Sequence, residues 1–157
     1  MSVNPIPSGY HSVTPYLIVD DAAAAIAFYR EAFGATEVLR LPIGSRTGHA
    51  EIKIGDSHVM LSDEWPEMDM VGPATRGGTS VSLVLYVTDV DLPFGRALAA
   101  GAREERAVEN QFYGDRTGTL IDPFGHRWSL ATHIEDVSPE EMQRRLDAMT
   151  VAADAPA

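Results

Sequence analysis

The sequence predicts an α+β protein built from two similar modules, each a strand, a helix and three further strands. Runs rich in β-branched and aromatic residues indicate strands, and the same order of elements occurs twice along the chain. With 157 residues, the chain is long enough for one domain with a substantial core. Its net charge of −11 disfavours nucleic acid and anionic membranes as partners, and the lack of cysteine excludes disulfides and thiolate chemistry.

The first module, residues 13–64, begins with a strand that is followed by an Ala-rich helix over 22–33. Gly34 suits the left-handed residue that often ends a helix. The four predicted strands of this module lie at 13–19, 36–43, 48–54 and 58–62.

The second module, residues 81–133, repeats this order after a loop rich in Pro, Gly and Met. Asp89 or Asp91 is expected to cap its helix, and Gly101 to end it. The four predicted strands of this module lie at 81–87, 104–113, 117–122 and 127–133.

A C-terminal helix is predicted over residues 138–149, followed by a flexible tail over 150–157. Ser138 and Glu141 fit a capping box, with Pro139 at the first helical position. The apolar stripe that is expected to dock on another surface consists of Met142, Leu146 and Met149.

Nothing at the N-terminus has the pattern of a basic segment followed by an apolar one. The longest apolar run, residues 22–29, is far shorter than a membrane span. We therefore expect a cytoplasmic protein without a membrane partner.

Several local motifs accompany the repeated module order. They are Thr-Pro-Tyr at 14–16, Ala-Ile-Ala-Phe-Tyr at 25–29, His-Ala-Glu-Ile-Lys-Ile-Gly at 49–55, Met-Leu-Ser-Asp at 60–63 and Asp-Pro-Phe-Gly-His-Arg-Trp at 122–128.

Together these motifs resemble the vicinal oxygen chelate superfamily of glyoxalases, bleomycin resistance proteins and dioxygenases, and in particular its PhnB-like branch. The resemblance implies a single domain over residues 10–134 with the glyoxalase/bleomycin resistance fold, in which two βαβββ modules form a curved mixed sheet. It also implies that the concave side of this sheet lines a ligand pocket and that the chain forms a homodimer.

Alternation along each strand separates a core face from a pocket face. The predicted core face includes Val13, Leu17, Val19, Ala50, Ile52, Ile54, Val81, Leu83, Leu85, Val87, Trp128 and Leu130. Polar and aromatic side chains remain for the pocket, as a small-molecule site requires. The candidate ligand-binding residues are Thr14, Tyr16, His49, Glu51, Asp63, Trp65, Ser82, Tyr86, Phe112, Tyr113 and Ser129.

Metal-binding members of the resembled superfamily take His, Gln or Glu ligands from four strand positions. The matching positions here are Thr14, one of Val59, Leu61 and Asp63, then Ser82 and Ser129. Hydroxyl side chains are poor ligands for transition metals, so we expect no metal at these positions and no cofactor.

A different site could form around His49 and Glu51, which share a strand face two residues apart. His126 or His133 could approach them from another strand to complete a nonstandard metal site. The pair could instead act as a general base with its orienting carboxylate. Asp115 and Arg116, by contrast, are expected to form a local salt bridge.

We therefore expect a protein that binds a small hydrophobic or aromatic molecule without the usual metal, such as a drug-sequestering resistance protein. One alternative is a metal-dependent lyase, isomerase or dioxygenase with a nonstandard ligand set. A third is an interaction protein with a vestigial pocket. The sequence leaves open whether any reaction is catalysed.

Overall fold

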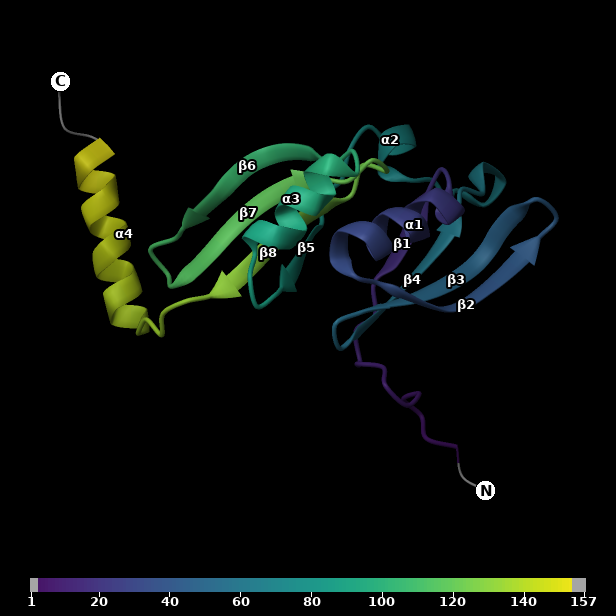
Figure 1. Ribbon diagram of the computed structural model, residues 1–157, viewed down its shortest axis with the longest axis horizontal. Coiled ribbons are helices and arrows are strands. Elements are labelled where there is room, and N and C mark those ends of the chain that lie inside the picture. Colours follow the sequence, from purple (N-terminus) through teal and green to yellow (C-terminus); the bar gives the residue numbers. More distant parts are fainter. Residues whose placement is uncertain (1–2, 154–157) are drawn as a thin grey trace.

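The computed structural model describes the backbone of residues 3–153 and the side chains of residues 3–150. Each module contains its own four-stranded mixed sheet (Figure 1). The first sheet has the order β1-β4-β3-β2, with β1 parallel to β4 and the other pairs antiparallel. Its strands are β1 (Tyr16–Val19), β2 (Thr36–Ile43), β3 (Arg46–Ile54) and β4 (Ser57–Asp63).

The second sheet repeats this topology in the order β5-β8-β7-β6, again with its first pair parallel. Its strands are β5 (Ser82–Tyr86), β6 (Arg103–Asn110), β7 (Asp115–Ile121) and β8 (Arg127–His133). The predicted α+β architecture of two βαβββ modules is therefore confirmed.

Two helices, α1 (Ala22–Phe33) and α3 (Asp91–Ala99), pack against each other where the modules meet (Figure 1). Asp21 accepts a hydrogen bond from the amide of Ala24 and so caps α1, while Gly34 ends it at φ 70°. In α3 the N-cap position is occupied by Val90, and the side chain of the preceding residue, Asp89, accepts the Asp91 amide at 3.0 Å. The crossover between the modules also contains a short 3₁₀ turn, η1 (Pro66–Met68), and a one-turn helix, α2 (Pro73–Arg76).

A buried carboxylate joins the two modules beneath these helices. The Tyr29 hydroxyl on α1 donates to Asp122 Oδ2 at 2.6 Å, and Trp128 Nε1 on β8 donates to the same oxygen at 2.9 Å. Asp122 Oδ1 accepts the amides of Phe124 and His126. Four donors therefore compensate the burial of one charge.

Two residues predicted for the core face lie at the surface instead. Val13 is 85% exposed and Val81 is 61% exposed. Both precede the paired segments, since β1 begins at Tyr16 and β5 at Ser82. The alternating pattern extends beyond the sheet, but without a neighbouring strand these residues have nothing to pack against.

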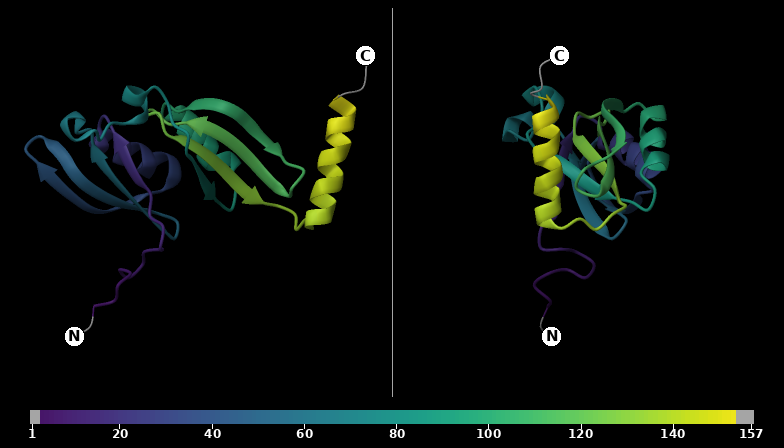
Figure 2. Two further views of the ribbon diagram at one scale, coloured as in Figure 1. Left: turned by 180° about the vertical axis from the view of Figure 1, so that it is seen from behind. Right: turned by 90° about the vertical axis from the view of Figure 1, so that its left-hand side faces the viewer.

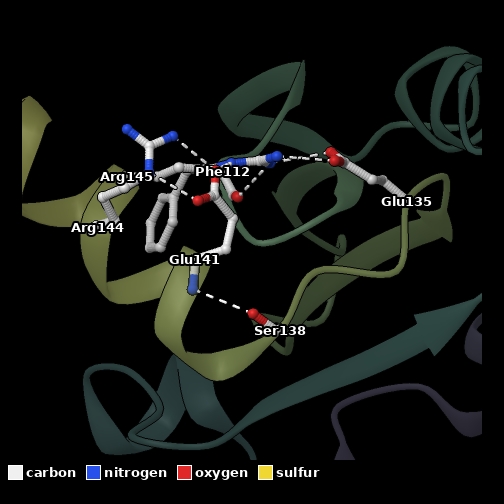
Figure 3. Close-up of polar contacts among 6 residues, drawn as sticks. All are labelled: Phe112, Glu135, Ser138, Glu141, Arg144 and Arg145. Atoms are coloured by element: carbon white, nitrogen blue, oxygen red, sulfur yellow. Dashed lines mark hydrogen bonds and ion pairs between the residues drawn. The ribbon is translucent and has the colours of Figure 1, made fainter.

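The C-terminal helix α4 (Pro139–Ala153) runs beyond its predicted end at residue 149 and does not dock on the body of the molecule (Figures 1 and 2). Only its base is held, because Arg145 donates to Glu135, Glu141 and the Phe112 carbonyl oxygen (Figure 3). Leu146 is 42% exposed and Met149 57%, so the predicted docking stripe is largely exposed. None of the helices in residues 3–153 has the length and apolar composition needed to cross a membrane.

Candidate functional site

The sheet of the first module presents a mixed apolar and polar face on the side opposite α1. Register places Tyr16, Met60, Glu51 and Leu39 side by side across the four strands. His49 lies two residues from Glu51 along β3, on the same face, and is paired with Leu41 on β2. Because directly paired residues project from the same side of a sheet, these side chains share one surface. We refer to it as the module 1 face.

A chain of hydrogen bonds crosses the module 1 face. The Tyr16 hydroxyl lies 3.0 Å from His49 Nδ1, and His49 Nε2 lies 3.1 Å from Glu51 Oε1. The other Glu51 oxygen accepts the hydroxyl of Tyr10. These bonds hold the Glu51 pKa below its usual value, chiefly through Tyr10 and then His49. The same carboxylate raises the pKa of Tyr10 to about 12.

Tyr10 is a residue of the module 1 face that the sequence analysis did not predict. It belongs to the segment before β1, where no periodic pattern marks a structured element. Its ring stacks on the His58 imidazole with centroids 4.0 Å apart, and His58 Nδ1 lies 2.8 Å from the Gly9 carbonyl oxygen. These contacts hold the N-terminal segment against β3 and β4.

A hollow of about 290 Å³ lies beside β1, between that strand and the crossover loop that contains α2. We refer to it as the β1 hollow. Tyr16 and Ile18 line it from the strand, and Arg76, Thr79 and Ser80 line it from the loop. Tyr16 is 43% exposed, so its ring is accessible to a ligand.

A second hollow, of about 450 Å³, lies on the sheet of the second module. Its lining is polar and combines Arg106, Glu109 and Thr119 with the predicted site residues Tyr113 and Ser129. The Thr119 and Ser129 hydroxyls lie 3.4 Å apart. This module 2 hollow can offer hydrogen bonds and charges of both signs to a ligand.

The predicted local salt bridge between Asp115 and Arg116 is wrong. Arg116 instead pairs with Asp91 on α3 at 2.8 Å, which lowers the pKa of that carboxyl group. Asp115 accepts the Tyr86 hydroxyl at 2.7 Å and contacts His133 Nδ1 at 2.7 Å. Adjacent residues in a strand project to opposite faces, so the two side chains find different partners.

The structure thus brings together some of the predicted site residues and separates others. Tyr16, His49 and Glu51 share the module 1 face, whereas Tyr113 and Ser129 share the module 2 hollow. Tyr86 belongs to the Asp115 cluster described above.

The remaining predicted residues have other contacts. Asp63 accepts the amides of Ala22 and Thr47, so its carboxylate fixes the start of α1 to the sheet. Trp65 lies in the loop after β4, with the Arg46 guanidinium 4.7 Å from its ring centroid.

Three further predicted residues line neither the β1 hollow nor the module 2 hollow. Thr14 donates to the His11 carbonyl oxygen before β1 begins, and Ser82 stands at the start of β5 opposite Arg127. The ring of Phe112 packs edge-on against Tyr113 in the turn before β7.

The four positions that the family resemblance assigns to metal ligands do not form a donor set. Val59 and Leu61 are buried in the core, and the Asp63 carboxylate already accepts two amides. Within the described part of the chain, no group of three His, Asp or Glu side chains is arranged to hold a metal ion.

Among the residues that the structure describes, no third ligand joins His49 and Glu51 in a nonstandard metal site. His126 Nε2 lies 2.9 Å from the Ile18 carbonyl oxygen, and His133 belongs to the second module. Both nitrogens of His49 already have protein partners, Tyr16 and Glu51. The geometry of this pair therefore favours proton exchange over metal coordination.

Comparison with known proteins agrees with this fold. The model of the Glyoxalase/Bleomycin resistance protein/Dioxygenase superfamily matches residues 9–130. The uncharacterized protein Mb0911c of Mycobacterium bovis is 43% identical over 152 residues, which cover 94% of this chain and 97% of the relative. YjdN of Escherichia coli is 24% identical, covering 75% of this chain and 92% of that protein.

Solved structures share the fold. TioX from Micromonospora sp. ML1 superimposes with a TM-score of 0.61 at 24% identity, covering 82% of this chain and all of TioX. The fosfomycin resistance protein FosX from Listeria monocytogenes gives a TM-score of 0.60 at 16% identity, covering 83% and 96% of the two chains. A PhnB protein from Bacillus cereus gives 0.63 at 17% identity, with 78% and 99% coverage. The chain therefore belongs to the glyoxalase/bleomycin resistance protein/dioxygenase superfamily.

Proposed function

We propose that this protein binds a small apolar or aromatic molecule, without a metal at the positions that the superfamily uses for one. The observation that carries the proposal is the module 1 face, where exposed Leu39 and Leu41 and the half-exposed ring of Tyr16 surround a fixed chain of polar groups. Apolar walls with a few placed hydrogen-bonding groups are the usual composition of a small-molecule site.

Drug sequestration is the form of this function that we favour. FosX is named as a fosfomycin resistance protein, and the superfamily description itself includes bleomycin resistance proteins. Binding alone is sufficient for sequestration, so no reaction needs to be assigned to the chain.

A neutral aromatic probe tests this function directly. We expect 4-nitroanisole to shift the backbone amide resonances of β1 and β3 in a two-dimensional NMR titration, and the variant Leu39→Gln to weaken its binding several-fold. The matched control is Leu146→Gln, which makes the same change on the exposed helix α4. Absence of binding at millimolar probe, or equal weakening by both variants, would contradict the proposal.

Metal content tests the second half of the proposal. Protein purified without a His-tag and then offered Zn, Ni, Mn and Fe(II) should contain far less than one metal ion per chain by elemental mass spectrometry. A stoichiometry near one that is lost in His49→Ala would instead support a metal-dependent lyase, isomerase or dioxygenase.

We also propose that the protein acts as a homodimer. The edge strand β5 and the residue before it expose an apolar patch, which we call the β5 patch and which consists of Val81, Val84 and Tyr86, each 61% exposed. An edge strand with exposed apolar side chains is a common surface for pairing with another chain. A second copy would cover this patch.

A further inference from the structure

The hydrogen bonds on the module 1 face define the direction in which a proton can move. Glu51 is a carboxylate, because two donors reach it and lower its pKa. A carboxylate only accepts hydrogen bonds, so the neutral His49 tautomer that fits these contacts carries its proton on Nε2, which faces Glu51. His49 Nδ1 is then a free acceptor, and the Tyr16 hydroxyl at 3.0 Å donates to it.

This arrangement has the order of a hydroxyl, a base and an orienting carboxylate. The same order of roles activates the hydroxyl group in Ser-His-Asp sites, where it is recognised from geometry and not from sequence position. Tyr10 occupies the remaining Glu51 oxygen and keeps the carboxylate in place. The side chains of His49 and Glu51 are only 25% and 16% exposed, so water competes little for their mutual bond.

The hydroxyl end of this triad has access to a ligand. Tyr16 is 43% exposed and its hydroxyl bond to His49 lies at the surface, whereas the side chains of His49 and Glu51 are mostly covered. A ligand on the module 1 face can therefore reach the Tyr16 oxygen more readily than the two groups behind it.

We propose that Tyr16, His49 and Glu51 form a proton-accepting triad for a planar weak acid, a phenol or an enol, bound on the module 1 face beside the Tyr16 hydroxyl. The inference rests on the proposed function, since it requires the same face to bind a small molecule. The ligand O–H bond breaks, its electron pair stays on the ligand oxygen, and the proton passes to the Tyr16 oxygen. At the same time the Tyr16 proton passes to His49 Nδ1, which gives an imidazolium paired with Glu51 and an anionic ligand.

The test compares 4-nitrophenol with 4-nitroanisole, which has nearly the same shape but no acidic proton. At a pH where free 4-nitrophenol is mostly neutral, the wild-type complex should show the absorption band of the phenolate. We expect the ionisation equilibrium of the bound probe to shift by about tenfold, or one pKa unit. Tyr16→Phe and His49→Gln should each abolish this shift.

Matched controls separate this triad from binding alone. His11→Gln makes the same change as His49→Gln at another imidazole that is paired with a carboxylate, Asp56, and it should leave the phenolate band unchanged. Binding of 4-nitroanisole should be similar in wild type and Tyr16→Phe. That result also shows that the variant is folded.

Three outcomes would overturn the triad. If 4-nitrophenol binds to the wild type but stays neutral, the proposed proton transfer is wrong and the proposed binding function still stands. Equal ionisation in wild type and Tyr16→Phe would assign the proton to another group. If neither probe binds, the proposed function fails and the triad fails with it.

Discussion

At the scale of single residues, the buried carboxylate of Asp122 depends on its hydrogen-bond donors for stability. It accepts four hydrogen bonds, from two side chains and two backbone amides, and one of these donors lies on the opposite module. Its burial is tolerated because every donor is present, and removal of any partner leaves an incompletely compensated charge.

Asp122→Asn should therefore destabilise the protein strongly. The variant keeps an oxygen for the two amides but places an NH₂ donor against the Trp128 N–H donor. We expect a loss of about 3 kcal/mol in the free energy of unfolding, measured by urea denaturation. Tyr29→Phe removes a single bond and should cost only about 1 kcal/mol. An equal loss in the two variants would show that the carboxylate has no special role.

The contacts of His133 predict how the stability of the protein depends on pH. Its pKa is raised, first by Asp136 and then by Asp115, which contact its two ring nitrogens at 3.0 and 2.7 Å. Because the pKa is higher in the folded state, the stabilisation is complete below the unfolded value of about 6.5 and is lost as pH rises through the folded pKa. An NMR titration should place the His133 pKa above 6.5 and Asp136→Asn should lower it. An unshifted pKa in both proteins would contradict this assignment.

At the scale of elements, the strands and helices were largely predictable because their patterns are local. The apolar face of α1 and the glycine that ends it are encoded within a dozen adjacent residues. Strand ends were harder, as Val13 and Val81 show, because pairing with a distant strand decides where a sheet begins. Tyr10 was missed for the same reason, since only the folded chain brings it to Glu51. Alternation along β3 was sufficient to place His49 and Glu51 together.

The orientation of α4 depends on a single side chain. Arg145 reaches the linker at Glu135 and the Phe112 carbonyl oxygen, whereas Arg144 bonds only to Glu141 within the helix (Figure 3). Arg145→Gln should therefore speed amide hydrogen exchange in residues 139–149, and the control Arg144→Gln should change it much less. The same increase in both variants would mean that intrahelical pairing with Glu141, and not the anchor to the second module, holds α4.

At the scale of the whole molecule, several elements expose large apolar side chains to solvent. The helices cover one side of each sheet, while β2, β5 and the stripe on α4 leave large side chains exposed. These surfaces lie at both ends and along the edges of an elongated molecule (Figure 2). A second copy could cover several of these surfaces at once. Because β2 also belongs to the module 1 face, we expect the proposed dimer contact and the proposed ligand site to lie next to each other.

A substitution in the β5 patch tests the proposed homodimer directly. Val84→Asp places a charge on the exposed edge strand and should shift the protein from dimer to monomer in sedimentation velocity at micromolar concentration, because a buried unpaired charge opposes association. Leu92→Asp is the matched control, since Leu92 is 65% exposed on α3 and lies outside the patch. It should leave the dimer intact. A wild-type monomer at all accessible concentrations would refute the homodimer and require the module 1 face and the module 2 hollow to bind ligands independently.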